Sequence, residues 1–156
     1  METTYHLTSK GLEALRKEYE GLLELKKIKT TGDDVPSILH SEEANPEYLS
    51  FQEDMVLLEG RIADLENIFK NAVLIAPPTG EEKKKIGLGA IVTVDLGGEV
   101  DEFTIVGTLE ADPLRKKISN ESPLGRGLLG MRAGDMVKVK TALINHDCKI
   151  LKISYL

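Results

Sequence analysis

The sequence predicts an α+β fold: an N-terminal antiparallel coiled-coil hairpin, then a small antiparallel β domain with one short helix. In the first half, apolar residues recur at helical spacing, and in the second half they alternate with polar residues in short runs rich in β-branched side chains. A segment with two prolines, a glycine and several charges separates the two patterns. We therefore expect the hairpin over 1–75, a linker over 76–85 and the β domain over 86–156.

The first helical pattern begins after Thr8, the expected N-cap, and ends near Gly32. Its apolar residues recur every three or four positions, which predicts a single apolar stripe along the helix. The stripe consists of Leu12, Leu15, Tyr19, Leu22, Leu25 and Ile28.

The second helical pattern has a clear start, with Asn45 as N-cap, Pro46 at the first helical position and Glu47 in the first turn. Its apolar residues follow a strict spacing of four and three, which is typical of a coiled-coil seam. Neither helix could bury its stripe alone, so the two are expected to pair as an antiparallel hairpin. The seam consists of Phe51, Met55, Leu58, Ile62, Leu65, Phe69 and Ala72.

The pattern in the second half of the chain predicts short strands. Residues 90–96 and 100–106 alternate apolar and polar side chains around Gly97-Gly98, which predicts a β-hairpin. A short strand is expected around 114–119, and Ser122-Pro123 should open a short helix that ends at Gly130. Two more strands are expected over 136–141 and 148–154.

Composition excludes several classes. A lone Cys148 cannot form an internal disulfide, no run of about 18 apolar residues exists, and no signal peptide is visible. The pI near 5.2 argues against a duplex-DNA binder held by phosphate contacts. The three histidines have no ligand spacing, so a zinc site is not expected. We expect a cytoplasmic, non-membrane monomer without a cofactor of its own.

Acidic residues are concentrated at the predicted turn of the hairpin. Residues 33–54 contain seven carboxylates and no lysine or arginine, whereas the whole chain has a net charge of −6. The remainder is therefore close to neutral, at +1 (−6 minus −7). An acidic tip on a stiff support suits contact with a metal ion or a basic partner, although a solvated acidic loop would have the same composition.

Motifs in the second half, together with the helical hairpin, resemble the Gre transcript-cleavage factors of bacteria. The similarity lies in Ile118-Ser119-x-x-Ser122-Pro123-Leu124, in Leu128-Leu129-Gly130 with Gly134-Asp135, and in Asn45-x-Glu47-Tyr48. The resemblance implies an FKBP-like fold for the β domain. It also implies that this domain docks on a coiled coil at the rim of the secondary channel of RNA polymerase, while the hairpin enters the channel.

In that family the tip acids help to hold a second catalytic Mg²⁺ and to orient the water that hydrolyses backtracked RNA. Carboxylates suit this role because Mg²⁺ prefers hard oxygen ligands and keeps several waters. By resemblance, Glu42 and Glu43 are the candidate catalytic acids, acting in trans on a Mg²⁺ shared with the polymerase. The candidate polymerase-docking residues are Ser119, Glu121, Ser122, Pro123 and Leu124.

The tip departs from the family pattern Gly-Asp-x-x-Glu-Asn-Ala-Glu-Tyr. Aligned through Asn45 and Tyr48, the chain has Ser41 and Ala44 at the two acidic positions, and Glu42 and Glu43 lie between them. Two functions therefore stay open: a factor that stimulates RNA cleavage, and a channel-binding factor that modulates or inhibits the polymerase without cleavage.

Three lysines late in the first helix, Lys26, Lys27 and Lys29, could lie near the RNA 3′ end, because phosphate contacts need only positioned cations. Exposed helix-surface lysines are the simpler explanation. An alternative of another class is a prolyl isomerase, but such a site needs an aromatic-lined apolar pocket, and 86–156 offer only Phe103 and Tyr155. A plain coiled-coil adaptor would not explain the acidic tip.

Overall fold

The protein is described from a computed structural model that covers residues 3–32, 36, 45–140 and 145–155. Its internal contacts divide the chain into two compact units, Leu12–Asn71 and Met1–Gly11 with Ala72–Leu156. The first eleven residues therefore belong with the C-terminal unit, whereas the sequence-based boundaries placed them in the hairpin. The predicted linker contains a 3₁₀ helix, η1 (Gly80–Lys84).

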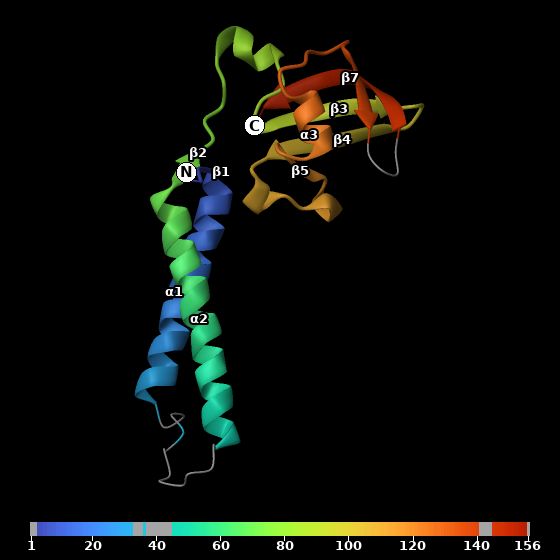
Figure 1. Ribbon diagram of the computed structural model, residues 1–156. Helices are drawn as coiled ribbons and strands as arrows, with labels where there is room; N and C mark the ends of the chain where they lie inside the picture. Colours follow the sequence, from blue (N-terminus) through green and yellow to red (C-terminus); the bar gives the residue numbers. More distant parts are fainter. Residues whose placement is uncertain (1–2, 33–35, 37–44, 141–144, 156) are drawn as a thin grey trace. The chain divides into compact units, whose positions relative to one another are not determined.

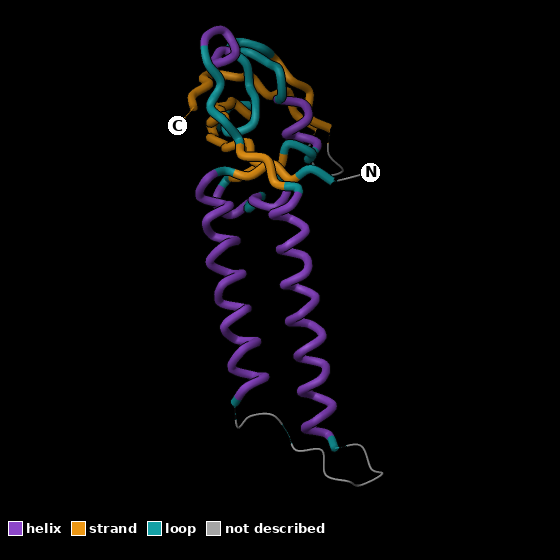
Figure 2. Tube along the Cα trace, turned by 90° about the vertical axis from the view of Figure 1, so that its left-hand side faces the viewer, coloured by secondary structure: helices purple, strands orange, loops and turns teal. Residues whose placement is uncertain are grey.

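Two long helices form the hairpin. Helix α1 (Ser9–Thr31) and helix α2 (Pro46–Lys70) lie side by side and antiparallel in both views (Figures 1 and 2). With 23 and 25 residues, they are about 35 and 37 Å long at 1.5 Å per residue. The predicted coiled-coil hairpin is confirmed.

The seam of α2 follows the predicted register. Leu58, Ile62 and Leu65 are buried as expected, and Ile68 joins them from the neighbouring heptad position. Tyr19 of α1 packs edge-to-face against Phe69, with ring centroids 5.5 Å apart. These contacts concentrate the apolar packing of the hairpin in the half that is remote from the 33–44 segment.

The stripe of α1 was predicted wrongly at its C-terminal end. Leu25 and Ile28 are 42% and 50% exposed. The heptad register set by Leu12, Leu15, Tyr19 and Leu22 instead continues to Lys26 and Lys29. The prediction followed the apolar residues Leu25 and Ile28. The alternating spacing of three and four, continued from Leu22, leads instead to the two lysines.

Polar contacts also join the two helices. The Arg61 guanidinium donates to both carboxylate oxygens of Glu18, over 2.6 and 3.0 Å, in a fork geometry that suits arginine. This hydrogen bond lowers the pKa of Glu18 from its ordinary value. The Tyr19 hydroxyl donates to Glu66 over 2.8 Å, which raises the pKa of Tyr19.

The C-terminal unit is built on a five-stranded sheet of order β5-β4-β3-β7-β6 (Figure 1). Strands β3 (Ala90–Leu96) and β4 (Val100–Val106) form the predicted hairpin around two glycines with positive φ. Strands β6 (Met136–Lys140) and β7 (Asn145–Tyr155) pair antiparallel, and β7 also pairs with β3. The α+β class is confirmed.

One face of this sheet holds the core of the unit together with helix α3 (Pro123–Leu128). The core is aliphatic, as a chain without tryptophan requires, and Leu128 joins it from α3. Its fully buried members include Val92, Val94, Ile105, Leu128 and Ile150.

Strand β5 (Lys117–Ser119) is shorter than predicted and runs parallel to β4. The expected start at Leu114 is instead part of a 3₁₀ turn, η3 (Pro113–Arg115), because Asp112 caps Leu114 N–H and proline follows the cap. Leu114 is left 95% exposed.

Two short strands were missed. Strand β1 (Tyr5–Leu7) and strand β2 (Ala72–Leu74) form a separate parallel pair. Thr8 caps α1 as predicted, accepting from Gly11 N–H over 3.0 Å, but Glu110 of η2 (Thr108–Glu110) also accepts from the Thr8 backbone N–H over 2.6 Å. Three-residue strands give too short a period to be seen in sequence.

We expect Leu65→Ala to destabilise the hairpin by about 2–5 kcal/mol, because Leu65 is fully buried and the truncation leaves a cavity. Leu57→Ala is the matched control: the same change at a side chain that is 73% exposed should alter stability by about 0.5 kcal/mol or less. Denaturant unfolding followed by far-UV circular dichroism measures both. Equal losses for the two variants would contradict the packing described for α2.

Candidate functional site

The predicted tip acids, Glu42 and Glu43, lie outside the described residues. The structure describes the two helix ends that flank them. Asn45 caps α2 through its Oδ1, which accepts from Glu47 N–H over 3.0 Å, and Pro46 follows it. The predicted start of the second helix is confirmed to the residue.

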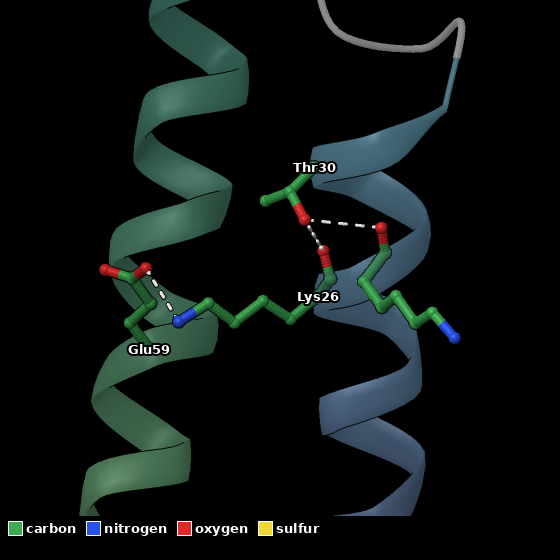
Figure 3. Close-up of polar contacts among 4 residues, drawn as sticks. Lys26, Thr30 and Glu59 are labelled. Atoms are coloured by element: carbon green, nitrogen blue, oxygen red, sulfur yellow. Dashed lines mark hydrogen bonds and ion pairs between the residues drawn. The ribbon is translucent and has the colours of Figure 1, made fainter.

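The other flank is the C-terminal end of α1, where threonine hydroxyls satisfy backbone carbonyls. Thr30 Oγ1 donates to the carbonyl oxygens of Lys26 and Lys27, over 2.8 and 3.2 Å (Figure 3). Thr31 Oγ1 donates to the carbonyl oxygen of Lys27 over 2.6 Å. These hydroxyls bond back along the helix to the carbonyls three and four residues earlier, a pattern that threonine adopts within helices.

Of the three predicted RNA-proximal lysines, two reach across to α2. Lys26 Nζ lies 3.1 Å from Glu59, and Figure 3 shows its side chain extended between the helices. Lys29 Nζ lies 3.1 Å from Asp54. Lys27 is exposed and has no ion pair with any residue in the described part of the hairpin. The structure therefore gives Lys26 and Lys29 partners within the chain.

The predicted docking residues lie together in the turn that links β5 to α3. Ser122 is the N-cap of α3: its Oγ accepts from Gly125 N–H over 3.0 Å and donates to Ser119 O over 2.7 Å. Glu121 and Pro123 are exposed, whereas Leu124 is half-buried against the core. This turn thus presents two of the five candidates to solvent on a hydrogen-bonded support.

Sequence reasoning missed two residues that shape this turn. The Thr108 hydroxyl donates to Glu121 over 3.0 Å and lies 3.2 Å from the Ser119 hydroxyl. Gly125 is buried, and a Cβ there would lie 2.0 Å from the Ser119 carbonyl oxygen. A glycine two residues after Ser-Pro, inside a helix, was the available signal, because helices otherwise disfavour glycine.

A small pocket of about 160 Å³ lies beside the same turn. It is lined by Thr3–His6 at the N-terminus, by residues 107–109, and by Asn120 and Glu121. Gly107 permits the close approach of β1, because a Cβ there would lie 2.0 Å from the His6 carbonyl oxygen. The N-terminal segment therefore borders the candidate docking turn.

Neither a metal cluster nor a membrane-spanning helix is found in the described residues. No group of three or more His, Cys, Asp or Glu side chains there is arranged to hold a metal ion. No helix among them combines the length and apolar character needed to cross a membrane.

Known proteins similar to this chain agree on one family. Residues 81–155 match the family described as "Transcription elongation factor, GreA/GreB, C-term". A transcription elongation factor GreA from Thermomicrobium roseum is 39% identical over 136 residues, covering 86% of this chain and 87% of the relative. The chain belongs to the GreA/GreB family. A GreA from Clostridium kluyveri is 37% identical, covering 96% of this chain and 95% of the relative.

Among solved structures, the GreA factor homolog 1 (Gfh1) of Thermus thermophilus is 28% identical, with a TM-score of 0.42. The match covers 97% of this chain and 99% of the Gfh1 chain.

GreA-type factors are accessory elongation factors, so the chain is not assigned as an enzyme. The two aromatics considered for a prolyl isomerase serve structural contacts: Lys116 Nζ lies 5.5 Å from the Phe103 ring centre, and the Tyr155 hydroxyl donates to Lys85 O.

We expect Ser122→Ala to destabilise the C-terminal unit by about 1 kcal/mol, because it removes an N-cap and the hydroxyl that bridges to Ser119. Ser50→Ala, at an exposed position of α2, is the control and should not lower stability. Hydrogen exchange of the α3 and β5 amides locates the loss. Unchanged exchange in Ser122→Ala would show that the cap does not support the turn.

Proposed function

We propose that this Gre-family factor binds bacterial RNA polymerase, with its hairpin in the secondary channel and its C-terminal unit on the coiled coil at the channel rim. Family membership, at 39% identity over 86% of the chain, is the observation that carries the proposal. Two features support it: paired helices about 35 Å long can reach into a deep channel, and the acids are concentrated where the helices are joined. We also propose that the factor works in the cytoplasm as a monomer.

In this function Glu42 and Glu43 supply carboxylates at the polymerase active site and thereby stimulate cleavage of backtracked RNA. Carboxylate oxygens are ligands that Mg²⁺ accepts, and one or two of them suffice for an ion that keeps several waters. The Mg²⁺ is shared with the polymerase and supplies activation of water or stabilisation of the leaving oxygen. The nascent RNA 3′ end is contacted only indirectly.

A second candidate is favoured by the tip sequence. Ser41 and Ala44 occupy the positions where the family pattern has acids, and the glutamates lie between them. A factor with displaced acids would still enter the channel and would modulate or inhibit the polymerase without cleavage.

We expect Glu42→Ala/Glu43→Ala to abolish RNA shortening in stalled, backtracked polymerase complexes supplied with Mg²⁺, because the tip then lacks its adjacent acids. Glu81→Ala/Glu82→Ala is the matched control, since it removes two adjacent exposed glutamates from η1. Gel analysis of 3′-labelled and 5′-labelled RNA measures the shortening.

Three results separate the candidates. Shortening by the parent chain that is lost only in the tip variant supports cleavage by these acids. Binding to polymerase without shortening selects the modulator. Absence of binding to polymerase contradicts both.

We expect Glu121→Lys to weaken binding to polymerase by about tenfold or more, equivalent to about 1.4 kcal/mol, because Glu121 is exposed in the proposed docking turn. Glu102→Lys, an exposed position on β4, is the control of equal charge change. Fluorescence anisotropy of labelled factor measures the affinity, and cleavage should recover at saturating factor. An unchanged affinity would remove this turn from the interface.

A further inference from the structure

The chemistry of the hairpin seam changes along its length. In the half that holds the start of α1 and the end of α2, the a and d heptad positions of α1 are apolar, and the buried side chains of α2 lie in the same half. In the half near the tip, the next two seam positions of α1 are Lys26 and Lys29. Lysine at a seam position lowers stability and needs a specific reason.

Each seam lysine has an acidic partner on α2. Lys26 pairs with Glu59 and Lys29 with Asp54, both at 3.1 Å, and the lysine side chains are 40% and 29% exposed. Figure 3 shows the Lys26 side chain extended between the helices to Glu59. Partial burial is expected for such a lysine, because its apolar stem can be covered while its ammonium stays in water. The two pairs lie on the last two turns of α1.

Apolar burial is weaker at this end of the hairpin. The buried seam side chains of α2 lie at Leu58 or later in the chain, and the two earlier seam residues, Phe51 and Met55, are only partly buried. Leu25 and Ile28 of α1 are half exposed, and Val56 and Leu57 of α2 are 69% and 73% exposed. Within the described residues, the two ion pairs are the polar contacts that join the helices near their tip ends, where the apolar seam side chains are only partly buried.

The geometry points to Lys26 and Lys29 as positioning residues: through Glu59 and Asp54 they close the tip end of the hairpin by charge, and so set the separation of Thr31 and Pro46. These two residues bound the segment that carries the tip acids. The role of this closure in delivering those acids rests on the proposed function, but the closure itself does not.

Closure by exposed charge has a consequence that apolar packing would not have. The attraction between partly exposed ions is screened as ionic strength rises, since the Debye length falls from about 30 Å at 0.01 M salt to about 3 Å at 1 M. Apolar burial at Ile62 and Leu65 is not weakened in this way. The tip end should therefore open in salt while the opposite end stays closed.

The test measures the separation of the two helices by electron spin resonance between pairs of spin labels. One pair, at Lys27→Cys and Glu53→Cys, reports on the tip end, and the other, at Glu20→Cys and Asp64→Cys, reports on the apolar half; all four positions are exposed. Cys148 is fully buried, and the unsubstituted chain measures its background labelling. We expect the distribution of label-to-label distances at the tip end to broaden about twofold between about 0.02 and 1 M salt. The distribution for the pair in the apolar half should stay unchanged.

Charge variants separate a specific pairing from a general effect of net charge. Lys26→Glu/Lys29→Glu should broaden the tip distribution already at low salt, and the added changes Glu59→Lys/Asp54→Lys should restore it by exchanging the partners. Lys10→Glu/Lys70→Glu, an equal charge change at the other end of the helices, should leave it unchanged. Lys26→Met/Lys29→Met should give a distribution that no longer responds to salt.

The inference is overturned if the distribution of label-to-label distances at the tip end does not change with salt. It is also overturned if exchanging the charges of both partners does not restore the distribution that the lysine-to-glutamate changes broadened. Polymerase binding is measured in parallel by anisotropy, so that the two proposals fail separately. Salt-dependent closure without polymerase binding supports the ionic closure and contradicts the proposed function. Polymerase binding with a salt-independent tip contradicts the ionic closure alone.

Discussion

The pairing of α1 with α2 is the constraint on which the hairpin depends. Neither helix has an apolar surface wide enough to be stable alone in water, so each needs the other. Buried aliphatic side chains of α2, the Tyr19–Phe69 contact and the Glu18–Arg61 fork hold one half. Toward the tip the same register places ammonium groups beside carboxylates. One continuous seam thus combines a stable half with a half whose closure depends on charge.

The C-terminal unit solves a different problem, that of presenting a turn in one conformation. The Thr108 and Ser119 hydroxyls bond to each other, and the Ser122 hydroxyl donates to the Ser119 carbonyl oxygen. Buried Gly125 lets the helix approach that carbonyl. Ordering a turn within the free protein lowers the conformational entropy lost when a partner binds. Exposed Glu121 and Pro123 therefore stand on a surface that needs little rearrangement.

Long periodic elements could be predicted from the sequence, and short or partner-dependent features could not. Strict heptad spacing located α2, and Asn45-Pro46 located its first residue, because a cap and a helix-start proline are local signals. The end of the α1 stripe was assigned to Leu25 and Ile28 because residue type was followed in place of register. Strands β1 and β2 could not be predicted, because they pair with each other across a long stretch of sequence. The same holds for the bond from Thr8 to Glu110, since a local pattern carries no information about a distant partner.

The bond from Thr8 to Glu110 affects the order in which the parts of the molecule fold during synthesis. Thr8 and its partner Glu110 are separated by 102 positions, whereas the α1–α2 contacts join residues far closer in sequence. On a ribosome the chain emerges from its N-terminus, so the helical pair can assemble while most of the β-sheet is still unsynthesised. Leu7 and Thr8 are made before the η2 turn, but they reach their final environment only after that turn has been translated.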